Sequence, residues 1–223
     1  MSKIGDVTIE RVCLTWPAYG QAQGEVSTLT GSIPAGPVAL RIADLTFAVS
    51  VVPGRAGLDG PEAWRGVVRA GMGWGTELGE LHATYGGGPV KLSTILQHLA
   101  AECGERIELP ADVIVGTSFA RPVSLPGLPF TGADLLSLLR ERRVTGPWRV
   151  DTDGVTRFGV RPSTTVDPRR YAVLARSLSA GYRKISVTAL AGIVPGAILD
   201  GAVIGRLIIT EDAGSLMCET YER

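Results

Sequence analysis

Turn-forming residues divide most of this sequence into short apolar runs. It contains 29 glycines and 14 prolines among 223 residues, and they recur along most of its length. Glycine and proline favour turns, and short alternating runs between them are typical of β-strands. The pattern predicts an α+β protein that is mostly β, with two small β-barrel or sandwich parts flanking an α+β unit that has two short helices. We expect these parts to span residues 1–85, 86–162 and 163–223.

The N-terminal part begins with an alternating segment, residues 7–16. The side chains expected to face a core are Val7, Ile9, Val12 and Leu14. Because alternation in a strand has a period of two, the shift in phase near Arg11 predicts a β-bulge. Residues 38–52 form a longer run with a turn expected at Ala43-Asp44, and residues 53–60 are expected to form a loop.

The middle part begins after the sequence Gly86-Gly-Gly-Pro89 and should contain a first helix. One apolar stripe with helical spacing consists of Leu92, Ile95, Leu96, Leu99 and Cys103. Spacing of this kind predicts an amphipathic helix with its stripe buried. Ser93 is the expected N-cap residue, and Gly104 is expected just after the helix end.

A second helix followed by a hairpin is expected over residues 130–160. Thr131 and Asp134 are spaced as in a capping box. The buried side should come from Leu135, Leu136, Leu138 and Leu139. Strands at 148–150 and 155–158 should then pair around Asp151-Thr-Asp-Gly154, where glycine accepts a positive φ angle.

The C-terminal part should be β-rich again. Segment 171–181 favours either a short helix or a pair of strands, and the sequence leaves both open. Residues 201–212 alternate through Val203, Gly205, Leu207 and Ile209, with an expected turn at Asp200-Gly201. Evenly spaced short strands of this kind are typical of a small barrel or sandwich.

The formal net charge is zero, so nothing draws the whole chain towards nucleic acid or an acidic membrane surface. Charge is unevenly distributed, however, because residues 140–176 contain nine arginines against four acidic residues. Base composition of the genome explains an excess of arginine, but an arginine-rich contact face is the alternative. Alternating Trp148, Phe158 and Tyr171 indicate core positions more than a nucleic-acid stacking surface.

Three widely spaced cysteines, Cys13, Cys103 and Cys218, argue against a disulfide framework and indicate buried thiols in a reducing compartment. The N-terminus lacks the apolar core of a signal peptide, and no run reaches the roughly 20 residues of a membrane span. We therefore expect synthesis in a cytoplasm and no membrane contact.

Chemical signatures are weak throughout the sequence. His98 should lie on the solvent-exposed flank of the first helix, away from the apolar stripe. A zinc site of His82, His98 and Cys103 is disfavoured, because these residues have no tight pair spacing and the helix would have to turn its polar flank towards the loop. Residues 71–75 contain a Gly-x-Gly pattern but lack the helix that follows it in dinucleotide-binding folds. Asp151 and Asp153 are turn residues, favoured there because their side chains bond the local backbone. We assign no catalytic, cofactor-binding or metal-binding residue.

The chain resembles the baseplate hub proteins of tailed bacteriophages and related contractile systems. The resemblance rests on the helix of residues 90–104, the helix and hairpin of residues 131–159, and the closing segment 194–221. It implies a non-enzymatic structural subunit without cofactors, which assembles as a homotrimeric ring and joins the tail tube protein to the spike protein. The tape-measure protein is a further possible partner, and nucleic acid is expected only as cargo in a channel. Such a protein is made in the bacterial host's cytoplasm and resides in the baseplate of the virion tail.

The contact residues expected for such assembly are Arg140, Arg142, Arg143 and Arg149. An alternative is a small hydrolase, for example a cell-wall-degrading one carried by the same particle. A nucleic-acid-binding adaptor is a third possibility, for which affinity should fall steeply with salt.

Overall fold

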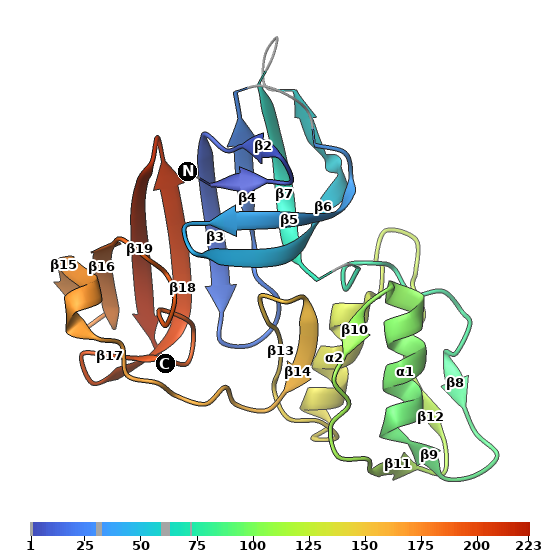
Figure 1. Ribbon diagram of the computed structural model, residues 1–223. Helices are drawn as coiled ribbons and strands as arrows, with labels where there is room; N and C mark the ends of the chain where they lie inside the picture. The colour runs from blue at the N-terminus through green and yellow to red at the C-terminus, as the bar shows by residue number, and fades with distance from the viewer. Residues whose placement is uncertain (1, 30–32, 59–62, 72) are drawn as a thin grey trace.

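A single twisted sheet dominates the computed structural model, which describes residues 2–29, 33–58, 63–71 and 73–223. Its 12 strands follow the order β15-β16-β19-β18-β3-β4-β7-β6-β5-β1-β2, with β17 beside β18. The sheet curls strongly into a half-barrel, and smaller sheets and two helices lie beside its lower edge (Figure 1). The α+β, mostly β fold class predicted from the sequence is thus confirmed.

Strands from both ends of the chain build this sheet. The N-terminal ones are β1 (Lys3–Ile4), β2 (Val7–Thr8), β3 (Arg11–Pro17), β4 (Gln23–Thr28), β5 (Gly36–Ile42), β6 (Leu45–Leu58) and β7 (Trp64–Ala70). The C-terminal ones are β15 (Tyr171–Ser177), β16 (Tyr182–Val187), β17 (Ile198–Leu199), β18 (Ala202–Asp212) and β19 (Ser215–Glu222). They join where β3 pairs with β18 in antiparallel register, from Arg11 opposite Asp212 to Pro17 opposite Arg206.

The core of the half-barrel follows the expected alternation in part. Ile9, Val12 and Leu14 are buried, and Val7 packs against the core. The phase shift near Arg11 is not a bulge: it separates β2, which pairs with β1, from β3, which pairs with β4 and β18. The Trp16 and Phe47 rings meet edge to face, with centroids 5.0 Å apart.

Three further segments differ in part from the strand pattern expected from the sequence. The expected loop at 53–60 is instead strand through Leu58, because β6 continues past a register shift between Val51 and Ala56; residues 59 and 60 lie outside the described residues. A bulge between Ile204 and Arg206 in β18 changes the phase, so Ile204 is buried instead of Val203. Segment 171–181 contains one strand, β15, and the turn that leads into β16; the helix alternative is wrong, and the second strand of the pair begins only at Tyr182.

The middle of the chain forms an α/β unit. Its helices are α1 (Leu92–Cys103) and α2 (Gly132–Glu141), and a short 3-10 helix, η1 (Pro168–Arg170), follows the unit. Its strands are β8 (Thr84–Tyr85), β9 (Val90–Lys91), β10 (Arg106–Ile107), β11 (Ile114–Gly116), β12 (Phe119–Ala120), β13 (Trp148–Val150) and β14 (Val155–Phe158). They pair as β10-β14-β13, β11-β9 and β12-β8. No helix among the described residues is long and apolar enough to span a membrane.

Both helices begin and end largely as the sequence predicts. All five residues of the predicted α1 stripe are buried, and Gly104 ends α1 at φ +66°. Ser93 is not the N-cap, because Lys91 occupies that position; instead, the Ser93 backbone N–H donates to Asp112 Oδ1 at 3.0 Å. The capping box of α2 is present: Asp134 N–H donates to Thr131 Oγ1, and Thr131 N–H donates to Asp134 Oδ2.

The predicted hairpin joins the α/β unit to the half-barrel. β13 and β14 pair around a turn in which Gly154 has φ +74°, as expected. The Gly20 loop pairs with β13, since Gly20 N–H donates to Trp148 O at 2.6 Å and Val150 N–H donates to Gly20 O at 2.9 Å. Backbone hydrogen bonds of this kind fix the two parts relative to each other.

Candidate interaction surface

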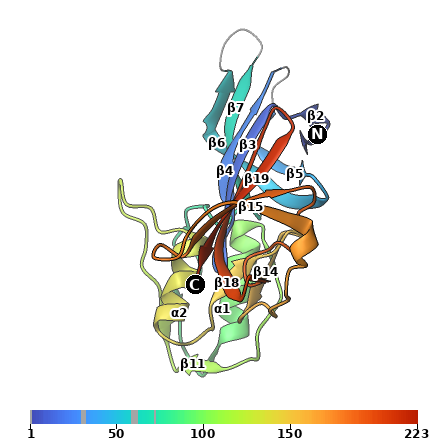
Figure 2. The ribbon, with the colours of Figure 1, turned by 90° about the vertical axis from the view of Figure 1, so that its left-hand side faces the viewer.

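Strand β15 forms an open edge of the large sheet. Among the described strands it pairs only with β16, from Tyr171 opposite Val187 to Ser177 opposite Tyr182, with a register shift between Val173 and Ala175. Its outer side faces away from the molecule at one end of the sheet (Figure 1), and Figure 2 views the molecule from that end. An edge of this type carries backbone N–H and C=O groups that can pair with another chain.

The β15 edge is also apolar and exposed. Five consecutive residues, 172–176, are exposed on both faces of the strand. Val173 and Leu174 are 43% and 56% exposed, and Leu178 in the following turn is 71% exposed. Proteins commonly protect long edge strands with charge, proline or a covering element. In β15 the one charged residue is Arg176.

A second exposed apolar feature is the tip of the loop between β12 and α2. Leu125 and Leu128 close a tight turn through reciprocal backbone hydrogen bonds of 3.1 and 2.8 Å. Their side chains are 58% and 70% exposed. The tip lies in the α/β unit, and β15 lies at the far end of the large sheet (Figure 1). The two apolar features therefore form separate surfaces.

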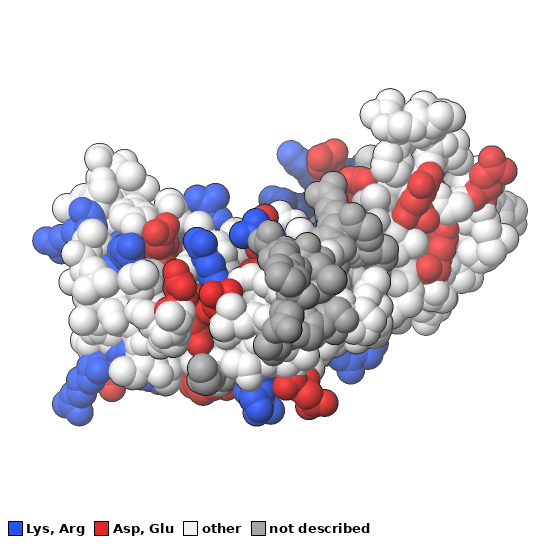
Figure 3. All heavy atoms as spheres, turned by 90° about the horizontal axis from the view of Figure 1, so that it is seen from above, with Lys and Arg blue, Asp and Glu red and all other residues white. Residues whose placement is uncertain are grey.

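Three of the four arginines predicted as contact residues are exposed at the end of α2: Arg140, Arg142 and Arg143. The Arg140 guanidinium lies 5.7 Å from the Tyr19 ring centroid, and that of Arg142 lies 5.6 Å from the Phe119 ring centroid. Charges of both signs are interspersed on the face shown in Figure 3.

Arg149, the fourth of these arginines, lies inside the protein. It is 7% exposed, and it donates to Asp151 Oδ1 at 3.2 Å and to Gly159 O at 2.8 Å. Arg157 and Arg161 also bind Asp151, so three guanidinium groups surround one carboxylate. Burial alone would raise the pKa of Asp151, but the hydrogen bond and charge of Arg161, with the charge of Arg149, hold it below its usual value.

Arg161 connects this cluster to both ends of the chain. It donates to Pro195 O at 2.8 Å, and its guanidinium lies 5.1 Å from the Trp16 ring centroid. Asp153 binds Arg157 at 2.8 Å, and this hydrogen bond is the main cause of the lowered pKa of Asp153. The aspartates do form the predicted turn, but their second role as ion-pair partners was missed. The excess of arginine in residues 140–176 was the feature of the sequence that could have indicated these ion pairs.

His98 was predicted to be solvent-exposed, and this is wrong, because it packs against His82 and Tyr85. The two histidine rings stack with centroids 3.9 Å apart, and Tyr85 Oη lies 3.3 Å from His98 Nδ1. His98 is half-buried in this stack, because the 76–89 loop folds back over the polar flank of α1. Stacked rings direct their nitrogen lone pairs side by side instead of towards one point. Among the described residues, no group of three or more His, Cys, Asp or Glu side chains is arranged to hold a metal ion.

The buried cysteines and the glycine-rich segment 71–75 are also part of the packed structure. Cys103 and Cys218 are buried, and burial is the main reason that the pKa of each thiol rises to about 12. A thiol with such a pKa is a poor nucleophile at neutral pH. In the glycine-rich segment 71–75, the N–H groups of Gly73 and Trp74 donate to Glu105 Oε1 at 2.6 and 2.9 Å. These N–H groups therefore hold a carboxylate of the same chain.

No protein-family model matches this sequence, and no curated protein is significantly similar to it. Solved structures do share its fold. The 43 kDa tail protein of prophage MuSo2 from Shewanella oneidensis has a TM-score of 0.59 and 12% identity, covering 98% of this chain and 95% of that chain. A tail protein from Neisseria meningitidis MC58 has a TM-score of 0.56 and 12% identity, covering 98% and 94%.

A third similar structure comes from a secretion system. The E. coli c3393 protein is described as a component of the type VI secretion system, similar in structure to the T4 bacteriophage tail proteins gp27 and gp5. Its TM-score is 0.59 at 13% identity, covering the whole of this chain and 77% of that chain. This chain therefore has the fold of phage-type tail proteins.

Proposed function

We propose that this chain is a structural subunit of a phage-type tail, in which it serves as a baseplate hub. In this role three copies assemble as a ring that joins the tail tube protein to the spike protein. The fold shared with tail proteins and with a secretion-system component supports a non-enzymatic, structural role. The ring would be built in the cytoplasm of a bacterial host and would reside in the baseplate of the virion.

The observation that carries this proposal is the open β15 edge. It combines unpaired backbone groups with exposed Val173, Leu174 and Leu178 on a strand that has no buried face. Exposure of this kind is unfavourable in an isolated subunit, because apolar area remains in water and the edge is open to pairing with other chains. Pairing with another copy would remove both costs at once.

A closed ring sets a geometric condition on that contact. Each copy must offer two different surfaces, one to each neighbour, since head-to-tail contacts close into rings. β15 supplies one surface in this proposal. The exposed arginines at the end of α2 lie away from β15, and we assign them to the second surface. The Leu125–Leu128 tip is left for the tail tube, spike or tape-measure protein.

The test is the oligomeric state of variants at the β15 edge. Double substitution V173K/L174K places two positive charges on side chains that are already exposed, so the subunit should remain folded. We expect sedimentation velocity to show trimers for the natural sequence and monomers for the variant at the same concentration. Far-UV circular dichroism should be unchanged.

Leu128→Lys provides the matched control, because Leu128 is 70% exposed but lies in the α/β unit. If β15 is the ring contact, this variant should remain trimeric. A natural protein that stays monomeric at high concentration would contradict ring assembly. Equal behaviour of V173K/L174K and the natural protein would rule out β15 as the contact.

A further inference from the structure

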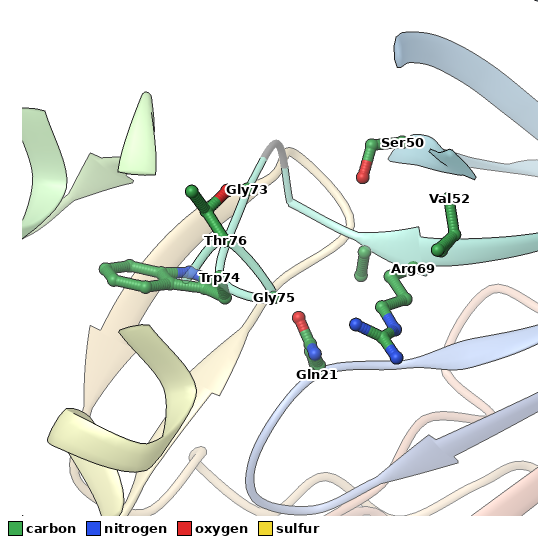
Figure 4. Close-up of a pocket in the computed structure, with 9 residues that line it drawn as sticks. Gln21, Ser50, Val52, Arg69, Gly73, Trp74, Gly75 and Thr76 are labelled. Atoms are coloured by element: carbon green, nitrogen blue, oxygen red, sulfur yellow. The ribbon is translucent and has the colours of Figure 1, made fainter. Parts of the chain in front are cut away.

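A small cavity lies where the half-barrel meets the loop that leads into the α/β unit. Its volume is about 200 Å³, and its lining comes from β6, β7, Gln21 and the segment 73–76. Arg69 is its only charged lining residue among those described. Figure 4 shows the Arg69 guanidinium, the Ser50 hydroxyl and the Gln21 amide directed into this space, whereas the Trp74 ring points away.

The Arg69 side chain reaches this cavity because of the alternation in β7. Val68 and Ala70 are buried on the core face, so Arg69 projects from the opposite face. It lies between Gln23 of β4 and Ser50 of β6, its partners in register. The cavity therefore opens on the outside of the half-barrel.

The guanidinium of Arg69 has no partner among the residues that the structure describes. Its Nε is buried without a hydrogen-bond acceptor, and none of the described lining residues is acidic. A buried donor of a charged group left unsatisfied is strongly unfavourable, so such groups are normally paired. Glu105 does not serve this purpose through its Oε1, which accepts the N–H groups of Gly73 and Trp74.

The guanidinium lies close to the segment 73–76. An added Cβ at Gly75 would lie 2.3 Å from Arg69 Nη1, so the guanidinium rests directly on the Gly75 backbone. A guanidinium presents its N–H groups as a planar fork. That fork matches the two oxygens of a carboxylate.

We propose that this cavity is a carboxylate-binding site. Arg69 would bind both oxygens of the ligand, and Gln21, Ser50 and Thr76 supply further polar groups around it. One guanidinium balances the single charge of a carboxylate, whereas a phosphate dianion would keep an excess of negative charge. Val52 lines the apolar side and suits a short alkyl stem. The volume is several times that of one water molecule, which occupies about 30 Å³ in the liquid.

The carboxylate has two possible sources: a free short-chain acid, or an Asp or Glu side chain of another copy of this chain. The site does not depend on ring assembly, because its evidence lies within one subunit. Sodium propionate is the probe for both sources, with sodium chloride at equal ionic strength as the reference.

The first measurement is a titration followed by backbone amide chemical shifts in NMR. Propionate should shift the amides of Gln21, Ser50 and residues 73–76 in a saturable manner. Affinity should fall by about tenfold or more in Arg69→Gln, because a charge-assisted hydrogen-bond pair is lost. Arg41→Gln removes an equal charge from an exposed position on β5 and should bind as the natural protein does.

A second pair of variants keeps the charge and changes only its position. Gly75→Ala should displace the guanidinium and weaken binding. Gly79→Ala, whose added Cβ would have its nearest neighbour at 3.7 Å, should not. Absence of saturable shifts in the natural protein, or equal affinity in Arg69→Gln, would overturn the proposal.

Sedimentation velocity in the same samples identifies the source. An unchanged mass on addition of propionate assigns the site to a free acid. A mass that falls with propionate, and that is equally low in Arg69→Gln, assigns it to a side chain of another copy. A natural protein that is monomeric throughout contradicts the ring, and the carboxylate site is then judged by the titration alone.

Discussion

The backbone N–H of Trp74 donates a hydrogen bond of 2.9 Å to the Oε1 atom of Glu105, 31 residues further along the chain. Gly73 donates to the same oxygen at 2.6 Å. Glu105 is 8% exposed and directly follows Gly104, the residue that ends α1. One carboxylate thus holds the loop after β7 against the end of a helix.

Glu105→Gln should destabilise the protein by about 1–3 kcal/mol, because a neutral amide accepts these two N–H groups less strongly and a donor replaces one oxygen. Urea unfolding followed by circular dichroism measures this change. Glu80→Gln is the control, since Glu80 is exposed nearby in sequence, and it should stay within about 0.5 kcal/mol of the natural protein. Equal stability of both variants would show that Glu105 does not hold the loop.

The arginine cluster around Asp151 should make stability depend on acid. The folded-state pKa of Asp151 is lowered, so its contribution is fully present above the unfolded pKa of about 4 and is lost as pH falls through the folded value. Urea unfolding between about pH 7 and pH 2 should therefore show a decline confined to the acidic end.

Asp151→Asn removes this titration. We expect a loss of about 1–3 kcal/mol at pH 7, because three arginines lose their shared charged acceptor, and a smaller loss of stability below about pH 4. Asp167→Asn is a suitable control, as Asp167 is an exposed carboxylate that caps η1. A variant whose acid dependence matches that of the natural protein would exclude Asp151 as the source.

Reversing the charge of Arg140, Arg142 and Arg143 tests their predicted contact role. The triple substitution to glutamate should weaken assembly and leave the subunit folded, because all three side chains are exposed. Sedimentation velocity measures the first effect and circular dichroism the second. Arg41→Glu is the control for charge alone. If assembly is unchanged, these arginines are not contact residues.

Gly132 at the start of α2 allows a close approach between α1, α2 and the Trp74 loop. An added Cβ would lie 2.6 Å from Cys103 Sγ and 2.9 Å from Trp74 Cε3. Gly132→Ala should therefore destabilise the protein by about 1–3 kcal/mol through overpacking, although alanine is the better helix former. Thermal or urea unfolding measures it.

Gly146→Ala is the matched control, because its added Cβ would have no neighbour closer than 3.6 Å. It should be neutral or slightly stabilising. If both alanine variants behave alike, the close packing at Gly132 is not a constraint on the fold.

Local patterns in the sequence predicted local structure well. The α1 stripe, the Thr131–Asp134 capping box and the Gly154 turn are all present, because each depends on residues within a few positions of one another. The fold class was also predicted correctly. Frequent turn residues keep the strands short whichever strands become neighbours in the sheet. The strand or helix ambiguity at 171–181 remained because a short apolar run suits both.

Long-range pairing decided the rest. Pairing of β3 with β18 joins residues about 200 positions apart in sequence, as the bond of Ser2 N–H to Glu211 also does. The His82–His98 stack, the arginines around Asp151 and the cavity beside Arg69 likewise arise where distant segments meet. The sequence by itself determined which segments become strands, helices and turns, because those depend on local sterics and periodicity. Only the tertiary structure decided which side chains share a cluster, a cavity or an open edge, because these depend on contacts between segments whose order in space the local pattern does not encode.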